Sequence, residues 1–309
     1  MSKNWNHMPN EIKWMIIDNM DLLTRTRLKL CSKFDKCVVE ALKFKCQRVE
    51  VYHRINKFDS HFSIRSNNLQ APGLNIKSSS NNVIITGDNY EREIAFNDKE
   101  SARKFVEDAF INIMLNANVR TNKFSSDMKF PEEFENLKIY AKKAQFISET
   151  GEEVMKWLGK VVPGVEKIRA FTDSTDDEKR KLRGFATVPA IINAKHVTFC
   201  NECDVNDEQL LNLKCTNLDI FILDKITEHG INQLIKKWIK EDYPVGSNLK
   251  SHKEFNNLPQ ILEGLKYEVV RELEGGIEVR IEMKNKKVLV FKYGSTYFMW
   301  PHGFQMCIE

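Results

Sequence analysis

Residues 5–44 read WNHMPNEIKWMIIDNMDLLTRTRLKLCSKFDKCVVEALKF, and this stretch decides how the rest of the chain is interpreted. Pro9 suits a first helical turn, because the amide that proline lacks would have no helical partner there. Ile12, Ile16 and Met20 recur every four residues. That spacing predicts a helix with one apolar stripe along its length.

Two further helices are predicted behind the first. Asp21 is a favourable N-cap for a helix that runs through Leu28, and Ser32 or Asp35 can begin a third helix. In the third helix the residues expected to face inward are Val38, Val39 and Leu42. Three short helices in about 40 residues make a small core, so we expect this unit to bury a face against a partner.

This stretch resembles an F-box, the adaptor-binding module of SCF-type ubiquitin ligases. The resemblance lies in Met8-Pro9, Glu11, Ile12, Ile16, Leu22-Leu23, Leu28 and Cys31-Ser32-Lys33-Phe34, within a module at residues 3–46. The opening Trp5-x-x-Met8-Pro9 is similar to the large F-box families of nematodes. Met8 replaces the usual leucine and Phe34 a frequent tryptophan, and both substitutions keep a large apolar side chain.

The resemblance implies that the helical module contacts the small adaptor subunit of the ligase, and through it, indirectly, the cullin complex. The residues that it implies at or behind this contact are Met8, Pro9, Ile12, Ile16, Leu28 and Phe34. The alternative interpretation of the same helices is an ordinary three-helix cap on a larger domain.

Composition limits the possible classes of protein. The chain has 309 residues, 42% of them hydrophobic and 29% charged, as in a soluble globular protein. The net charge of +4 is too small to imply nucleic-acid binding. No apolar run approaches the ~18 residues of a membrane helix, and no secretory signal is expected. Seven scattered cysteines indicate free thiols in a reducing compartment, so we expect a cytoplasmic or nuclear protein.

After the helical module, residues 47–97 alternate short strand-like pieces with polar turns. We predict a connecting region with strands at Arg48–Ile55, His61–Arg65, Asn82–Thr86 and Glu91–Phe96. Val49 and Val51 alternate with polar neighbours, which is typical of a half-buried strand.

Residues 98–309 are predicted to form one βα domain, which opens with a helix capped by Asp98. Strands are expected at Leu137–Ala141, Val165–Phe171, His196–Phe199 and Leu218–Leu223. Helices are expected after Thr150, over Phe185–Asn193, and after Asn206 and Thr227. Strand starts some 20 to 30 residues apart favour an irregular, leucine-rich-repeat-like solenoid. A conventional α/β sheet built from the same elements is the alternative.

The end of the chain is predicted to be an antiparallel β-meander. Its strands are expected at Lys266–Leu273, Ile277–Met283, Lys287–Tyr293 and Thr296–Trp300, with a hairpin turn at Glu274-Gly275-Gly276. The predicted fold is therefore mixed α and β, with an N-terminal three-helix F-box, an irregular βα region and a final meander.

A second resemblance covers roughly residues 100–300. The run Ile231-Asn232-x-Leu234-Ile235-Lys236-x-Trp238-Ile239 is similar to the F-box-associated domain of nematode proteins, as is Ile261-Leu262-x-Gly264-Leu265-x-Tyr267. The run Pro189-Ala190-x-x-Asn193-Ala194-Lys195 is similar to the related FTH-type domain. The order of the two modules along the chain agrees with these families.

Candidate chemical sites are few. His196, Cys200, Cys203 and Cys215 have residue types that suit zinc, but the second half lacks a Cys-x-x-Cys spacing, so small buried thiols are the preferred interpretation. No phosphate-binding glycine loop, nucleophile elbow or His-Glu-x-x-His helix is present. The charge run Asp173–Arg183 is interpreted as a solvated surface, with recognition of a charged partner as the alternative. We expect no catalytic residue, metal or cofactor.

The resemblance implies a non-catalytic substrate receptor that binds an unknown protein substrate through its C-terminal domain. We expect neither nucleic acid nor a membrane among its partners. Ubiquitin transfer would then follow from proximity, because a tethered substrate has a high effective concentration near the ligase. Two alternatives remain: an adaptor-binding interaction protein without ligase outcome, and a zinc or thiol protein that uses Cys200, Cys203 and Cys215.

Overall fold

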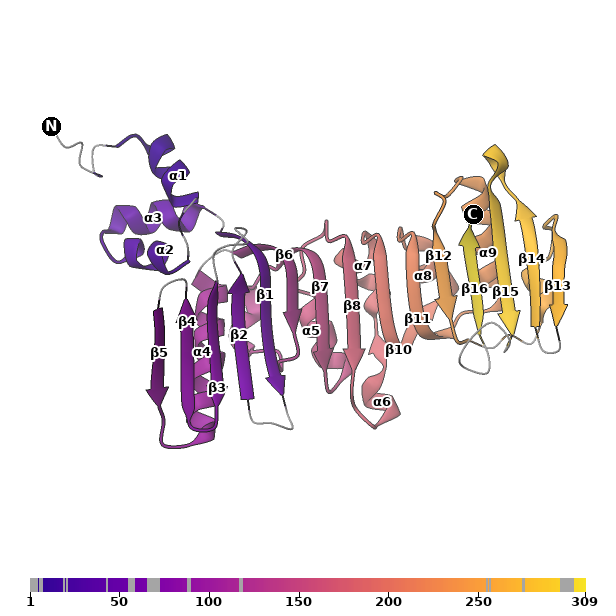
Figure 1. Cartoon of the computed structure of the whole chain (residues 1–309). Helices are drawn as coiled ribbons and strands as arrows, with labels where there is room; N and C mark the ends of the chain where they lie inside the picture. Colours follow the sequence, from indigo (N-terminus) through magenta and orange to yellow (C-terminus); the bar gives the residue numbers. More distant parts are fainter. Residues whose placement is uncertain are drawn as a thin grey trace. The chain divides into compact units, whose positions relative to one another are not determined.

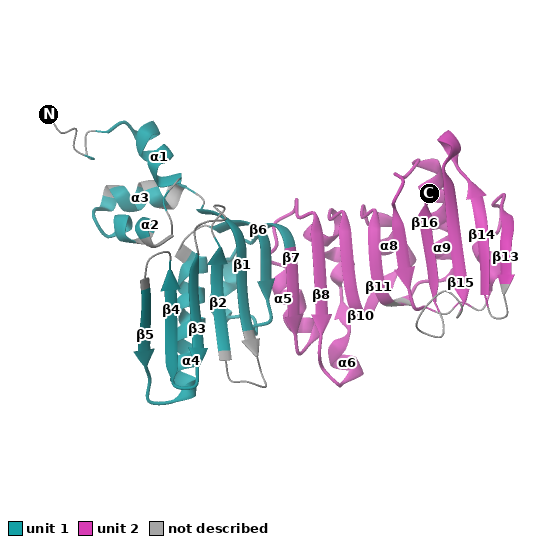
Figure 2. Ribbon diagram, in the orientation of Figure 1, with its two compact units in different colours: residues 1–143 teal, residues 144–309 magenta. Residues whose placement is uncertain are grey.

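A computed structural model gives the structure of the chain in two compact units, residues 1–143 and 144–309 (Figure 2). It describes residues 5, 8–18, 20, 22–42, 44–54, 59–65, 73–87, 90–116, 119–253, 255, 257–273, 276–294 and 303–309. The domain boundaries predicted from the sequence, 3–46, 47–97 and 98–309, differ from the boundary between these two units. They stay predictions.

The first unit begins with the three predicted helices. They are α1 (Asn10–Asp18), α2 (Leu22–Lys29) and α3 (Lys33–Ala41). Ser32 is the N-cap of α3, and its hydroxyl oxygen accepts a 3.0 Å hydrogen bond from the amide of Asp35. The predicted N-cap of α2, Asp21, lies outside the described residues. Ser32 was one of the two residues predicted to begin the third helix, and the structure confirms it as the N-cap.

The predicted stripe on the first helix was out of phase. The small core of this module contains Ile17 and Val39, with Met20 and Leu28 packed partly against it. Lys13, four residues before Ile17, is buried, whereas Ile12 stays 43% exposed. The Lys13 ammonium lies over the Trp5 ring, 5.5 Å from its centre, so a cation–π contact accompanies the burial of this lysine. A stripe chosen from aliphatic residues alone misses this arrangement.

The sheet of the first unit is an antiparallel meander of five strands, with one parallel strand added beside the first of them. Its strands are β1 (Phe44–Arg54), β2 (Asp59–Arg65), β3 (Leu74–Ser79), β4 (Asn82–Gly87), β5 (Tyr90–Ala95) and β6 (Val119–Ser126). Strands β1 to β5 pair consecutively, and β6 pairs in parallel with β1. The sequence prediction missed β3 and β6.

Helix α4 (Lys99–Asn116) covers one face of this sheet (Figure 1). Asp98 caps it as predicted, because its carboxylate accepts from the amide and the hydroxyl of Ser101 at 2.7 and 2.8 Å. Phe110 of α4 packs edge-on against Phe62 and Phe134, with ring centres 5.2 and 5.6 Å apart. The core of the unit therefore lies between α4 and the sheet, beside the short helix η2 (Glu132–Asn136).

The second unit is built on parallel strands joined by helices. Its elements include β7 (Tyr140–Ser148), within which the chain passes from the first unit to the second, α5 (Gly151–Leu158), β8 (Lys167–Thr172), α6 (Asp177–Arg180), β9 (Leu182–Arg183), η3 (Phe185–Thr187), α7 (Pro189–Ile192), β10 (His196–Asn206), α8 (Asp207–Asn212), β11 (Asn217–Lys225), α9 (Glu228–Lys240) and β12 (Asn248–Ser251). Figure 1 shows α5, α7, α8 and α9 on one face of these strands.

Strands β8, β10, β11 and β12 are parallel and in register. His196 is the Cα partner of both Lys167 and Asn217, and Asn217 is that of Asn248. The helix starts follow local signals: Thr150, Asn206 and Thr227 are the N-caps of α5, α8 and α9. The resemblance of this region to leucine-rich repeats stays a prediction.

The predicted helix over Phe185–Asn193 is broken in two. Val188 has an extended backbone, with φ −75° and ψ 120°, between η3 and α7. Pro189 explains the break, because a proline disfavours the helical conformation in the residue before it. The predicted strand Leu137–Ala141 is also shifted, since β7 begins at Tyr140.

The chain ends in an antiparallel meander, as predicted, and its last described strand, β16, was not predicted. After α10 (Leu258–Ile261) it contains β13 (Glu268–Leu273), β14 (Gly276–Glu282), η4 (Lys284–Lys286), β15 (Val288–Gly294) and β16 (Phe304–Ile308). Strand β16 pairs with β15 and, on its other side, with β12. The predicted strand Thr296–Trp300 lies outside the described residues. Strands β12 and β16 were missed because each depends on its distant partner.

Candidate functional site: the surface of the N-terminal helices

A buried polar network holds the N-terminal helices together. The indole nitrogen of Trp5 donates to one carboxylate oxygen of Asp35 at 2.7 Å, and the Ser32 hydroxyl donates to the other at 2.7 Å. Asp35 is only 3% exposed. The Trp5 hydrogen bond is the largest cause that lowers the pKa of Asp35, and Ser32 and the Lys13 charge act in the same direction. Asp35 therefore stays ionised and fixes α3 against the residues before α1.

A second set of contacts joins these helices to β1. The Arg25 guanidinium is buried 5.1 Å from the centre of the Phe44 ring and 3.6 Å from the carboxylate of Asp18. Lys45 of β1 reaches the other Asp18 oxygen at 2.9 Å. Burial is the largest influence on Arg25 and lowers its pKa, while Asp18 raises it. The inner face of the helices is thus occupied by the fold itself, which leaves the outer face for partners.

The outer face of α1 carries several of the residues predicted to bind the adaptor. Pro9 and Ile12 are exposed, and Met8 and Ile16 are half-buried. Leu28 packs partly against the core of the module and supports it from behind. The side chain of Phe34 lies outside the described part of the structure.

The structure adds exposed apolar residues that the sequence prediction missed. Met15 is 65% exposed and lies three residues after Ile12, on the face of α1 that points away from Lys13 and Ile17. Trp14 and Leu30 are exposed as well. Among the described residues, four of the nine exposed large hydrophobic side chains lie in this short module. We call Met8, Pro9, Ile12, Met15 and Ile16 the α1 patch. The sequence contains a sign of this patch, because Met15 lies three residues after Ile12 and therefore on the same helix face.

Exposed apolar side chains gathered on one helix face are typical of an interaction surface. Fully burying one isoleucine contributes about 1.5–3 kcal/mol, so a partner that covers Ile12, Met15 and Ile16 gains several kcal/mol. The arrangement has no grouping of an acid, a base and a nucleophile. What it offers chemically is a hydrophobic docking surface on a helix whose orientation the Asp35 network fixes.

The residues considered for zinc do not come together. His196 and Cys200 are exposed on β10, whereas Cys203 and Cys215 are buried. Burial raises the pKa of Cys215 to about 12. Burial also raises the pKa of Cys203 well above its usual value, so both groups are held as thiols. Within the described residues no three His, Cys, Asp or Glu side chains are grouped as metal ligands. All seven cysteines are free, as predicted.

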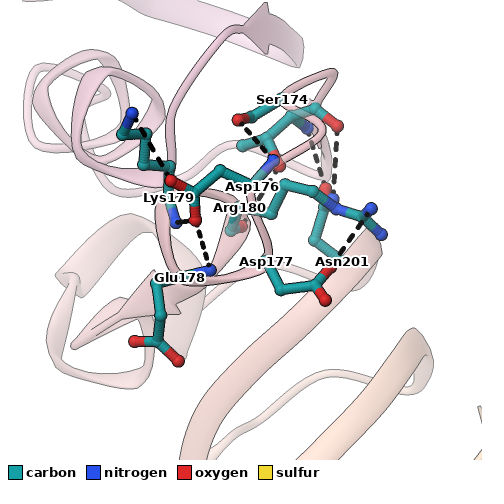
Figure 3. A network of polar contacts seen from close by, with 8 residues as sticks. Ser174, Asp176, Asp177, Glu178, Lys179, Arg180 and Asn201 are labelled. Atoms are coloured by element: carbon teal, nitrogen blue, oxygen red, sulfur yellow. Dashed lines mark hydrogen bonds and ion pairs between the residues drawn. The ribbon is translucent and has the colours of Figure 1, made fainter.

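The charge run Asp173–Arg183 forms an ordered surface element around α6 (Figure 3). Asp176 caps α6 by accepting from the amides of Glu178 and Lys179 at 3.0 and 3.4 Å. The run pairs its own charges, in Lys179–Asp176, Arg180–Asp177, Lys181–Glu178 and Arg183–Glu178. This self-pairing agrees with a solvated surface.

Comparison with known proteins identifies the N-terminal module. The family model of the F-box domain matches residues 5–47. No curated protein matches the chain, and no solved structure matches it. Within the described residues, no helix is long and apolar enough to cross a membrane. The predicted F-box is therefore confirmed, and an F-box implies binding to the adaptor of SCF-type ligases.

Proposed function

We propose that this protein is the substrate-recognition subunit of an SCF-type ubiquitin ligase. The observation that carries the proposal is the F-box match at residues 5–47, on which the α1 patch lies exposed. F-box proteins are typically receptors without catalytic activity of their own. The finer parts of the proposal are a nematode-type F-box, an F-box-associated or FTH-like domain at 98–309, and a cytoplasmic or nuclear location.

The adaptor would bind over the α1 patch and the residues around it. In this proposal Met8, Pro9, Ile12 and Ile16 contact the adaptor directly, and Met15 extends the contact. Leu28 supports the surface from behind, and Phe34 is included in the adaptor contact on the F-box resemblance alone. The Asp35 network keeps α1 and α3 in fixed orientation, which lowers the ordering cost of binding.

The substrate would bind on the C-terminal region, for which the strand face without helices is the best candidate. One row of this face places Arg169, Thr198, Asp219 and Lys250 on neighbouring parallel strands as Cα partners. The row is polar and mixed in charge, and it stands on rigid strands. A substrate held there shares a complex with the ubiquitin-charged enzyme, so transfer is accelerated by proximity alone.

Co-purification of the full chain with the ligase adaptor tests the proposal. We expect the wild type to bind and the double variant Ile12→Asp, Met15→Asp to lose binding, since each charge would be buried without a partner. Leu115→Asp is the matched control, because Leu115 on α4 is 44% exposed, close to the 43% of Ile12. Circular dichroism must show that both variants are folded.

Three results would contradict the proposal or redirect it. A wild-type chain that fails to bind the adaptor contradicts it. Adaptor binding without recovery of the cullin in the same complex favours an interaction protein without ligase outcome. Stoichiometric zinc in the purified chain would favour the zinc or thiol alternative.

A further inference from the structure

Three basic residues lie side by side across the sheet of the first unit. Strand β1 lies between β2 and β6 (Figure 1). Arg48 on β1 is the Cα partner of Lys123 on β6 and of Arg65 on β2. Val49 and Ile64, the strand neighbours of Arg48 and Arg65, are buried in the core. Because side chains alternate along a strand, the three cations belong to the face opposite α4.

Such a row is costly in the isolated protein. Like charges directly opposite each other on neighbouring strands are destabilising. Glu50 offsets part of the repulsion: one of its oxygens lies 3.3 Å from the Lys123 ammonium and 3.4 Å from the Arg48 guanidinium. Arg65 is exposed and has no ion pair among the described residues. One carboxylate facing three cations leaves the row with an excess of positive charge.

The head groups of the row are partly fixed in advance. The same Glu50 oxygen also accepts a 3.0 Å hydrogen bond from the Tyr52 hydroxyl, and the Glu50 side chain is only 8% exposed. Tyr52 stacks on His61, its Cα partner, with an angle of 7° between the rings. Arg48 and Lys123 are thereby held over the sheet, so little side-chain entropy is lost when an anion binds.

The excess of positive charge in the chain lies in the first unit. Residues 1–143 contain 24 Lys and Arg and 18 Asp and Glu, a net charge of +6, whereas residues 144–309 have −2. Glu91 and Glu93 of β5 lie on the same face of the sheet, through their pairing with Thr86 and Ile84. A long polyanion such as a nucleic acid would meet these carboxylates. A short anionic segment fits the row better.

We propose that the row of Lys123, Arg48 and Arg65 binds an anionic segment of the protein substrate. The inference rests on the proposed function and names the chemical class of its substrate. Arginine forks pair in two-point contacts with carboxylate and phosphate alike, and the Lys123 ammonium adds a point charge. The binding segment therefore carries clustered Asp and Glu side chains or phosphorylated residues. The row places part of the substrate contact on β1 and β2, which precede residue 98 and so lie outside the predicted F-box-associated region, and on β6, which lies within that region.

Fluorescence anisotropy with the full chain tests the inference. The probes are a labelled Glu-rich peptide, its phosphoserine counterpart, its Gln counterpart and a single-stranded oligonucleotide. We expect the anionic peptides to bind more weakly as salt rises, and the Gln peptide not to bind. Arg65→Glu should weaken binding by about tenfold or more. Lys104→Glu on α4, an exposed change of equal charge on the other side of the sheet, should leave binding within about twofold.

The outcomes separate the possible partners. Stronger binding of the phosphoserine peptide identifies phosphate as the preferred group, and equal binding identifies plain negative charge; both support the inference. No binding of either anionic peptide, or equal loss with Lys104→Glu, overturns it. Tighter binding of the oligonucleotide with the same Arg65 dependence also overturns it. Adaptor co-purification of the same samples is a separate readout, so failure of the proposed function is recognised independently.

Discussion

The indole nitrogen of Trp5 donates a 2.7 Å hydrogen bond to the carboxylate of Asp35, 30 residues later in the chain. This bond ties the residues before α1 to the first turn of α3, and the Ser32 hydroxyl holds the second oxygen of the same carboxylate. The position of the residues before α1 therefore depends on the buried Asp35 carboxylate, and the stability of this contact should vary with pH.

Trp5→Phe keeps a large ring but removes the donor to Asp35. We expect the free energy of unfolding to fall by about 1.5–3 kcal/mol at neutral pH, the usual contribution of a hydrogen bond to a charged group. Trp14→Phe, at an exposed position of the same module, should change it by less than about 0.5 kcal/mol. Chemical denaturation followed by circular dichroism measures both.

The hydrogen bond between Trp5 and Asp35 also predicts that the stability difference between wild type and Trp5→Phe depends on pH. The pKa of Asp35 is lower in the folded state, mainly through Trp5, so the folded protein binds this proton less readily than the unfolded chain. The stabilisation is complete above the unfolded pKa of about 3.9, and it disappears as pH falls through the lower folded value. The difference between wild type and Trp5→Phe should therefore shrink in acid. A difference that stays constant down to acid unfolding would contradict the assignment.

Gly230 lets α9 approach α8. Asp207 of α8 accepts from the amide and the hydroxyl of Thr227, the N-cap of α9, at 2.9 and 2.6 Å. A β-carbon at position 230 would overlap the Asp207 carboxylate. We expect Gly230→Ala to destabilise the second unit by about 1–3 kcal/mol through overpacking. Gly159→Ala is the control, since its backbone is helical and a methyl there meets only ordinary contacts. Thermal unfolding of both variants gives the comparison.

Several helix starts could be predicted from local capping residues. Several strands could not be predicted, because they form by pairing with segments distant in the sequence. Ser32, Thr150 and Thr227 each cap a helix through a hydrogen bond to an amide three residues away, so the signal lies within four residues. Strand β16 forms because β12 and β15 flank it, and no local pattern shows that partnership.

The exposure of the N-terminal helices was only partly predictable from the sequence. Ile12 and Ile16 were recognised as one stripe, and Ile12 is exposed in the structure; its contact with the adaptor stays a prediction. Met15 was missed, and the burial of Lys13 was not predicted. Lysine is rarely buried. Here the Lys13 ammonium lies over the Trp5 ring, and Trp5 is held by its hydrogen bond to Asp35.

Asn201 anchors the charged element of Figure 3. Its side chain is 3% exposed and pairs with both backbone groups of Thr172, accepting from the amide at 2.8 Å and donating to the carbonyl at 3.2 Å. Asn201→Ala leaves buried backbone groups unpaired, so we expect a loss of about 1–3 kcal/mol. Cleavage by trypsin after Lys179, Arg180 or Lys181 should also become faster. Asn193→Ala, at an exposed amide, should change neither quantity.

The cysteines should separate into fast and slow groups under alkylation. Cys31 and Cys37 are exposed on the N-terminal helices, whereas Cys46, Cys203 and Cys215 are buried. Burial raises the pKa of Cys46 and of Cys215 to about 12, and thiolates are the reactive form. Iodoacetamide at mildly alkaline pH, followed by peptide mass spectrometry, should modify Cys31 and Cys37 first and the buried three only after denaturant is added.

The alkylation rates also distinguish the thiol alternative from the receptor. A catalytic or metal-binding role for Cys200, Cys203 and Cys215 requires thiolates, which react quickly in the native protein or are protected only until a chelator removes the metal. Burial alone predicts slow reaction of Cys203 and Cys215 with and without chelator, and recovery of reactivity on unfolding. Adding the adaptor provides the last contrast: if it covers the N-terminal helices, alkylation of Cys31 or Cys37 should slow while the rate at Cys200 stays the same.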